Sequence, residues 1–231
     1  KISPDETLSI VQDLYEKKLV TYPRTDARVL STAVAKEIYK NISGLRNYPQ
    51  AGEAAQGALE LGAYKNIAKT RYTNDKQITD HYAIIPTGQG LGALKGLSLT
   101  AQRVYETIVR RFLSIFYPPA VYQKVSLVTK MENESFFSSF KVLLSEGYLK
   151  IAANSFAKKS MAEASGKTPE SEGEGEVSCD EALLAALQKL KKGDILNING
   201  LGIKEGETSP PKRYNSGSMI LAMENAGQLI E

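Results

Sequence analysis

The chain is organised around one stretch, Leu19-Val20-Thr21-Tyr22-Pro23-Arg24-Thr25-Asp26. A short apolar run delivers a tyrosine, a proline restricts the backbone after it, and an arginine follows two residues later. A tyrosine hydroxyl can act as a covalent nucleophile, and the planar guanidinium group of arginine matches phosphate oxygens. In an extended segment Tyr22 and Arg24 point to the same side, so one could attack a phosphodiester while the other neutralises charge. The alternative interpretation makes Tyr22 a half-buried packing residue.

Helical periodicity is found on both sides of this stretch. Ser3 is a predicted N-cap, with a proline at the first helical position and Glu6 three residues after the cap. Apolar residues then recur at helical spacing as far as about Lys18. Further helices are expected from Ser31 or Thr32, over residues 51–61, and from Thr100 to about Phe116, before Pro118-Pro119.

From Tyr122 onward the apolar residues alternate as they do in strands. The alternation predicts two strands joined by a turn at Glu132-Asn133, and a second turn at Glu146-Gly147 before residues 148–152 of the same β-rich unit. We expect a domain boundary near Pro118.

The remaining segments are predicted from composition and capping residues. Residues 157–178 are small, acidic and rich in glycine, which predicts a poorly ordered loop. Ser178 is expected to cap a short leucine-rich helix, Ile195 to Asn199 to form a strand, and Ser216 or Ser218 to open the last helix.

Composition limits the classes of protein that fit. The 231 residues suffice for one large domain or two small ones. One cysteine, Cys179, excludes an internal disulfide, and one histidine, His81, argues against a zinc site built from cysteine and histidine. No apolar run approaches the roughly 20 residues that span a bilayer. The net charge of +3 is too small to indicate nucleic-acid binding by itself. Neither end reads as a natural terminus, so we expect a fragment of a longer protein.

Four segments together resemble the type IA DNA topoisomerases, the topoisomerase III branch in particular. Tyr22 to Asp26, preceded by Leu14-Tyr15-Glu16-Lys17-Lys18, is similar to the active-site segment of that family. Residues 78–87, Ile-Thr-Asp-His-Tyr-Ala-Ile-Ile-Pro-Thr, are similar to its histidine motif. Residues 99–118 resemble the end of its catalytic domain, and residues 210–227 resemble the start of a later helical DNA-binding region.

The resemblance implies roles for the first two motifs. Tyr22 would be the nucleophile that forms a 5′-phosphotyrosine link, and Arg24 would stabilise the phosphate. His81 would be a third catalytic residue that contacts a backbone phosphate and could pair with Asp26. Thr25 and Asp26 would belong to the DNA-binding surface. The family commonly has a second histidine where this chain has Tyr82, so that role is not carried over.

The resemblance also implies that Lys212, Arg213, Tyr214 and Ser218 contact single-stranded DNA. Two cations and an aromatic ring suit phosphate contact and base stacking. The alternative is an exposed loop after Pro210-Pro211. Asn215-Ser216 replaces the more usual Thr-Glu, so hydrogen bonds from those positions are not carried over.

The implied fold is α+β and multidomain. Residues 1–118 would form a tyrosine-bearing domain that resembles a winged helix, residues 119–209 a β-rich arch, and residues 210–231 the start of a helical DNA-binding domain. The family places its Mg²⁺ site, a set of toprim carboxylates, before this segment, so no metal site is expected here and the fragment alone should be inactive.

Further expectations concern the whole protein. It would be a monomeric, ATP-independent isomerase in the bacterial cytoplasm, associated with the nucleoid and not with a membrane. It would act on single-stranded or negatively supercoiled DNA. The main rival is a non-enzymatic winged-helix DNA-binding module, which needs a recognition helix; residues 103–111 look amphipathic and core-facing instead. A relaxase or a tyrosine recombinase would need more histidines or a C-terminal tyrosine.

Overall fold

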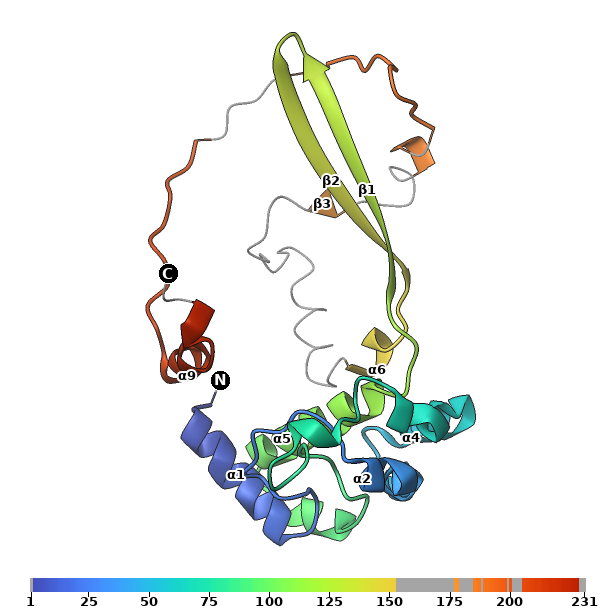
Figure 1. Ribbon diagram of the computed structural model, residues 1–231, viewed down its shortest axis with the longest axis vertical. Coiled ribbons are helices and arrows are strands. Elements are labelled where there is room, and N and C mark those ends of the chain that lie inside the picture. The colour runs from blue at the N-terminus through green and yellow to red at the C-terminus, as the bar shows by residue number, and fades with distance from the viewer. Residues whose placement is uncertain are drawn as a thin grey trace. The chain divides into compact units, whose positions relative to one another are not determined.

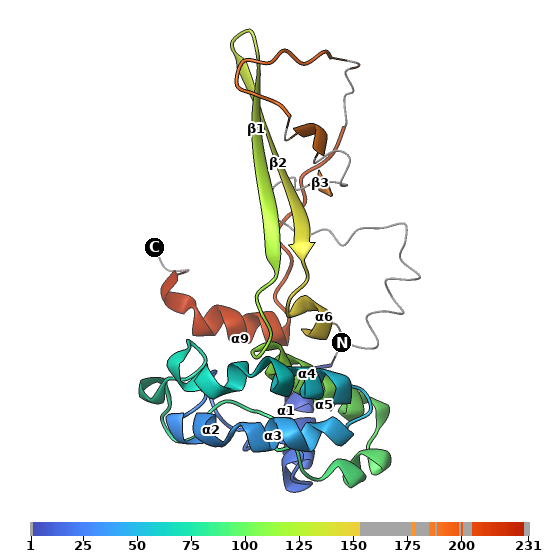
Figure 2. The same ribbon diagram turned by 90° about the vertical axis from the view of Figure 1, so that its right-hand side faces the viewer.

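The computed structural model describes residues 2–152, 177–178, 185–187, 189–198, 200 and 205–228. The chain divides into two compact units, which Figures 1 and 2 show as ribbons. The helical unit contains residues 5–123 and 143–174, of which 153–174 lie outside the described residues. The hairpin unit contains residues 1–4, 124–142 and 175–231.

Capping serines explain where two helices of the helical unit begin. The hydroxyl of Ser31 accepts a hydrogen bond from the Val34 amide, and Ser98 does the same for Ala101, each at 3.2 Å. The helices are α1 (Pro4–Glu16), α2 (Thr32–Glu37), α3 (Tyr39–Gly44), α4 (Gly52–Leu61), α5 (Leu99–Ser114) and α6 (Leu149–Ala152). Short 3-10 helices cover Leu45–Asn47, Ala63–Lys69, Asp75–Gln77 and Leu91–Gly96.

Helix α1 ends in a turn that delivers the chain to Tyr22. The Leu19 amide donates to the Leu14 carbonyl at 2.9 Å, and the Lys18 amide donates to the Tyr15 carbonyl at 2.8 Å. This pair of bonds is a Schellman motif, in which the residue at the position of Lys18 takes a left-handed conformation, here with φ of 60°. Leu14 and Leu19 are both fully buried, so their packing in the apolar core holds the turn in place.

The core of the helical unit is centred on α5. Its residues Tyr105, Val109 and Leu113 are fully buried, and the Phe112 and Phe116 rings meet edge to face at 5.2 Å. The predicted helices over residues 51–61 and from Thr100 to Phe116 are therefore confirmed in position. The other buried apolar residues of this core are Val11, Leu14, Leu19, Val20, Leu30, Ala35, Ile38, Ile42, Leu45, Tyr48, Ala51, Ala54, Ala55, Ala58, Ile67, Ile85, Leu97, Ala101 and Ile151.

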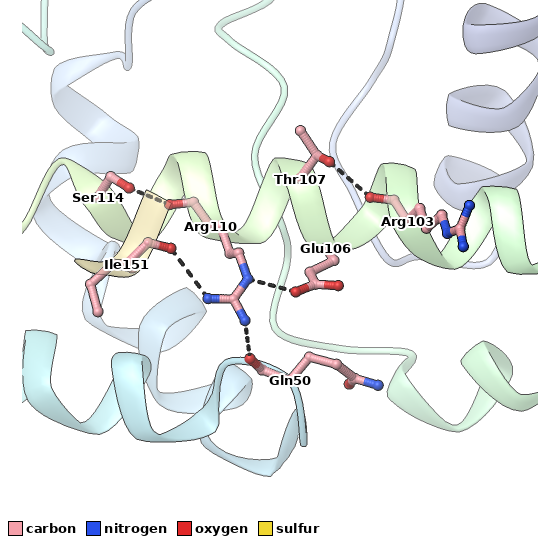
Figure 3. Close-up of polar contacts among 7 residues, drawn as sticks. All are labelled: Gln50, Arg103, Glu106, Thr107, Arg110, Ser114 and Ile151. Atoms are coloured by element: carbon pink, nitrogen blue, oxygen red, sulfur yellow. Dashed lines mark hydrogen bonds and ion pairs between the residues drawn. The ribbon is translucent and has the colours of Figure 1, made fainter. Parts of the chain in front are cut away.

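A buried arginine ties α5 to two other segments, as Figure 3 shows. Arg110 donates from Nε to Glu106 at 2.6 Å, and its two terminal nitrogens donate to the carbonyls of Ile151 in α6 (3.2 Å) and of Gln50 before α4 (2.7 Å). The Glu106 side chain is 2% exposed and that of Arg110 is 13% exposed. Three charge-assisted bonds therefore hold three segments at one point of the fold.

The second predicted turn is present, but the segment after it is helical. Gly147 has φ of 48° and approaches the carbonyls of Pro118 and Pro119 so closely that a Cβ would collide with both oxygens. The Tyr148 amide donates to the Pro118 carbonyl at 2.9 Å. Residues 149–152 then form α6 and pack on α5, so their assignment to the β-rich unit was wrong. Burial of Ile151 against α5 favours the helix over an exposed strand.

The two predicted strands form a long hairpin. Strand β1 (Val121–Met131) and strand β2 (Glu134–Ser145) are hydrogen-bonded neighbours, and Glu132 opens the turn with φ of 53°. A short strand β3 (Val177–Ser178) adds to β2 in parallel, with Phe140 opposite Val177. The end of the predicted loop 157–178 is thus a strand, and residues 157–176 lie outside the described residues.

The described tail contains the α-helix α9 (Ser216–Glu224) and a short 3-10 helix over Ala226–Gln228. Asn215 is the N-cap of α9 and Ser216 is its first residue. Of the two predicted starting residues, Ser216 and Ser218, the first is therefore confirmed. Residues 185–187 are helical, while most of the leucine-rich segment around them lies outside the described residues. Residues 195–198 form no strand, and Ile195 is 93% exposed, so that prediction was wrong: no neighbouring strand is present to pair with it in the described chain.

Helices and a small sheet together confirm a mixed α and β fold. The winged-helix and arch assignments, and the domain limits at residues 118 and 209, stay predictions. None of the helices in the described part of the chain is long and apolar enough to cross a membrane.

Candidate active site

Backbone pairing brings the two motifs of the helical unit together. The Thr21 amide donates to the Ile85 carbonyl and the Thr87 amide donates to the Leu19 carbonyl, both at 3.0 Å. These bonds flank an antiparallel bridge between Val20 and Pro86. The apolar run before Tyr22 therefore pairs with the end of the histidine motif, although more than sixty residues separate them in the sequence.

Two threonine hydroxyls reinforce this pairing. Thr21 Oγ1 donates to the Ala83 carbonyl at 3.2 Å and accepts from the Ile85 amide at 2.9 Å. Thr25 Oγ1 donates to the His81 carbonyl at 2.8 Å and accepts from the Ala27 amide at 3.0 Å. The segment that carries Tyr22 is thus attached to the histidine segment on both sides of the tyrosine. Thr25, which we predicted to bind DNA, has a structural contact here.

The rings of Tyr22 and His81 lie in contact. Their centroids are 4.3 Å apart with a tilt of 39°, and the Tyr15 ring meets Tyr22 edge to face at 5.5 Å. Tyr22 is half-buried, and His81 is exposed. We expected His81 to pair with Asp26, but the described residues give His81 no carboxylate partner, and Asp26 is exposed. Ring packing on Tyr22 fixes the imidazole on that side instead.

Tyr22 and Arg24 line two neighbouring hollows of the helical unit. The tyrosine hollow has a volume of about 530 Å³ and is lined by Tyr15, Glu16, Lys18, Val20, Thr21, Tyr22, Tyr82, Thr87 and Gln89. The arginine hollow has a volume of about 510 Å³ and is lined by Asp5, Leu8, Ser9, Gln12, Asp13, Glu16 and Arg24. Glu16 borders both hollows, so the two predicted catalytic side chains lie on either side of the end of α1.

The Tyr22–Arg24 segment is not a regular strand, since backbone pairing stops at Thr21. The alternation from which we expected Tyr22 and Arg24 to point the same way therefore does not apply. Arg24 is exposed, and the described residues give it no ion pair. Its guanidinium group is available to an anionic ligand near Tyr22.

Three residues that had no role predicted from the sequence line the same hollow as Tyr22. Tyr15 comes from α1, Glu16 from the last position of the same helix, and Tyr82 from the histidine motif. Burial raises the pKa of Tyr82 above its ordinary value. Tyr15 and Glu16 belong to the segment that precedes Tyr22 in the resemblance, but the sequence does not say what the exposed edge of the Tyr15 ring faces.

The predicted DNA-binding residues of the tail belong to the hairpin unit. Lys212, Arg213 and Tyr214 are exposed, and Tyr214 keeps 60% of its surface accessible. The Ser218 hydroxyl accepts from the Asn215 amide at 2.9 Å and donates to the Asn215 carbonyl at 3.2 Å. Ser218 is thus part of a capping box, which occupies the donor that we expected to reach a phosphate.

Metal ligands do not gather in the described ranges. No group of three or more histidine, cysteine, aspartate or glutamate side chains there could hold a metal ion. The carboxylates around the arginine hollow do not make such a group, so the residues present do not fit the magnesium site of the resembled family.

This chain is similar in sequence to known proteins over almost its whole length. Residues 1–228 match the sequence model of a family described as DNA topoisomerase. The chain is 35% identical over 230 residues to the DNA topoisomerase 3 of Bacillus licheniformis and 33% identical over 230 residues to that of Bacillus subtilis. A protein of the same name from Shouchella clausii is 32% identical over 230 residues. Each match covers 99% of this chain and 28% of the relative, so the chain spans less than a third of the length of these proteins.

Proposed function

Since this chain belongs to the DNA topoisomerase family, we propose that its full-length protein is a type IA topoisomerase that cleaves one DNA strand through Tyr22. The contact between the Tyr22 and His81 rings, at 4.3 Å, is the observation that carries the proposal. It joins two of the four segments on which the resemblance rests. A chance similarity of two separate segments gives no reason for them to meet.

The proposed reaction exchanges one phosphate ester for another. The Tyr22 oxygen attacks the phosphorus of a single strand, an O–P bond to tyrosine forms, and the bond to the departing 3′ sugar oxygen breaks. The phenol loses its proton in this step, and the departing oxygen gains one. The strand then carries a 5′-phosphotyrosine link on one side and a free 3′ hydroxyl on the other. A second strand passes, the 3′ hydroxyl attacks the same phosphorus, and Tyr22 is released. The ester bond energy is conserved, so ATP is not required.

Arg24 and His81 would act on the charge of the phosphate. Arg24 is exposed at the edge of α1, where its fork can reach phosphate oxygens. The exposed edge of His81 would contact a backbone phosphate next to the scissile one. Thr25 would position His81 through its 2.8 Å bond to the His81 carbonyl, and Asp26 would lie at the same surface.

The remaining proposals concern the whole protein. Lys212, Arg213 and Tyr214 are exposed cations and an aromatic ring, which suit single-stranded DNA. Mg²⁺ would be held by carboxylates outside residues 1–231, where it would stabilise phosphate charge. The substrate would be single-stranded or negatively supercoiled DNA, and residues 1–231 alone would not relax it. A monomer in the bacterial cytoplasm, associated with the nucleoid, is the state we propose.

The test compares the full-length protein with its Tyr22→Phe and Tyr39→Phe variants. Single-stranded DNA labelled at its 3′ end is incubated with Mg²⁺ and quenched with denaturant. We expect a labelled covalent adduct with the wild type and with Tyr39→Phe, because Tyr39 is an exposed tyrosine of α3 outside the site. Tyr22→Phe should form none. Binding without an adduct in all three proteins would favour the non-enzymatic DNA-binding module.

A further inference from the structure

Lys18 has a backbone conformation that a lysine rarely adopts. Its φ of 60° lies in the left-handed region, and Glu132 in the hairpin turn is the only other described residue besides glycine with a positive φ. In that region Cβ crowds the following carbonyl, which glycine avoids because it has no Cβ. The Schellman motif at the end of α1 explains the conformation but does not explain the lysine.

The turn is held firmly, so Lys18 cannot relax into another conformation. Thr87 Oγ1 donates to the Lys18 carbonyl at 2.5 Å, and Leu19, the next residue, is fully buried. Gly90 approaches the Lys17 carbonyl so closely that a Cβ there would collide with it. Strained residues that persist in this way are concentrated at functional sites.

The Lys18 side chain lines the tyrosine hollow beside Tyr22. Its neighbour Lys17 is ion-paired with Asp13 along α1, whereas the structure records no ion pair for Lys18 among residues 2–152. One of two consecutive lysines is therefore neutralised, and the other presents its positive charge beside the proposed nucleophile.

Three tyrosines, Tyr15, Tyr22 and Tyr82, line this hollow together with Glu16 and smaller side chains. Tyr15 stands edge to face against Tyr22, and Tyr82 is half-buried against the core. The volume of about 530 Å³ can hold one nucleotide, for which an aromatic wall offers stacking and a lysine offers a phosphate contact.

We propose that the tyrosine hollow is a nucleotide subsite of the cleaved strand, in which Lys18 binds a phosphate adjacent to the scissile one and Tyr15 and Tyr82 flank the base. The proposal rests on the function proposed above, because it takes the ligand to be single-stranded DNA. It assigns a binding role to three residues that the resemblance does not.

The first experiment uses the Lys18→Gly variant of the full-length protein in a Tyr22→Phe background, so that binding is measured without cleavage. Affinity for a fluorescent single-stranded oligonucleotide is measured by anisotropy from low to high KCl, and thermal melting is measured on the same samples. Lys17→Ala is the matched control, because it removes a lysine from the same turn that is already ion-paired. Lys18→Arg retains the charge.

The log of the affinity falls as the log of the salt concentration rises. We expect Lys18→Gly to make this fall less steep, by about 0.7 in the slope, which is the contribution of one phosphate contact on a single strand. Its melting temperature should equal that of the parent or exceed it, since glycine relieves the left-handed strain. Lys17→Ala and Lys18→Arg should keep the parent slope. An unchanged slope in Lys18→Gly would overturn the subsite, because Lys18 would then contact no phosphate. A fall in melting temperature would overturn it as well, because Lys18 would then stabilise the fold.

The second experiment tests the aromatic walls. Tyr15→Leu and Tyr82→Leu should each weaken oligonucleotide binding on the order of tenfold, and an abasic position beside the scissile phosphate should abolish that difference. Equal losses on normal and abasic strands would mean that neither ring touches a base. The adduct assay separates the two proposals: with an adduct but no slope change, only the subsite fails, and without an adduct, the cleavage function fails whatever the slope.

Discussion

Apolar side chains are buried in the helical unit and largely exposed along the β1–β2 hairpin. Phe116 keeps 1% of its surface accessible, whereas Phe137 in β2 keeps 79%. Besides β1 and β2, the described sheet has only the two-residue strand β3, and a two-stranded hairpin by itself is marginally stable in water. The Tyr22–His81 contact belongs to the part of the chain with its own core, so tertiary packing can hold its geometry. The hairpin relies on backbone pairing.

The largest difference between the two regions should come from matched phenylalanine truncations. Phe116→Ala removes a buried ring that packs edge to face on Phe112, and should lower the free energy of unfolding by about 3–5 kcal/mol. Phe137→Ala should change it by less than about 0.5 kcal/mol. Urea unfolding followed by circular dichroism measures both. Equal losses would mean that the Phe137 ring is buried in solution, which would contradict the difference between the two regions.

A smaller loss is expected when the buried ion pair of α5 is broken. Arg110→Met leaves Glu106 buried and removes the bonds to Gln50 and Ile151, which should cost about 3 kcal/mol in unfolding free energy. The control is Lys40→Met, which breaks the exposed pair with Glu37 and should have no measurable effect. Similar curves for the two variants would show that the arginine is not a tertiary anchor.

The bond between the two motifs should contribute less again. Thr21→Val preserves the shape of the side chain but leaves the Ile85 amide and the Ala83 carbonyl without the hydroxyl, at a cost of about 1–2 kcal/mol. Amide hydrogen exchange at residues 83–85 and at Thr87 should accelerate in this variant. Thr107→Val serves as the control, since that hydroxyl donates to the Arg103 carbonyl of the same helix at 2.9 Å. Exchange rates equal to those of the wild type would mean that the Thr21 hydroxyl does not stabilise the pairing of the two motifs.

The smallest expected effect is a gain in stability. The Tyr105 hydroxyl is buried and has no hydrogen-bond partner among the described residues, so Tyr105→Phe should stabilise the chain by up to about 1 kcal/mol. Tyr117→Phe should destabilise it by a similar amount, because the Tyr117 hydroxyl donates to the Ala54 carbonyl at 2.7 Å. Denaturant unfolding at neutral pH measures both.

The burial of the Tyr105 hydroxyl can also be tested by the pH dependence of stability. Burial raises the pKa of Tyr105, so above about pH 10 the unfolded chain loses this proton before the folded chain does. The unfolding free energy of the wild type should therefore fall as the pH rises past that value, and the fall should be smaller in Tyr105→Phe. An identical decline in both proteins would mean that the hydroxyl is solvated in the folded state.

Features that depend on neighbours along the chain can be predicted from the sequence. Ser31 and Ser98 cap helices because a hydroxyl reaches an amide three residues on, and the hairpin follows from alternation around Glu132-Asn133. The Tyr22 and His81 motifs were both identified as site residues. Local signals failed at residues 149–152 and 195–198, where burial on α5 or the lack of a partner strand decided the outcome.

The way in which the motifs meet depends on tertiary packing. The Tyr22–His81 contact, the bonds of Thr21 and the neighbourhood of Tyr15, Lys18 and Tyr82 join residues more than fifty positions apart. Such contacts depend on how the core around α5 packs and on how the turn after α1 directs the chain. Capping and periodicity carry no information about either, because they act over a few residues, whereas packing is settled by the whole helical unit at once.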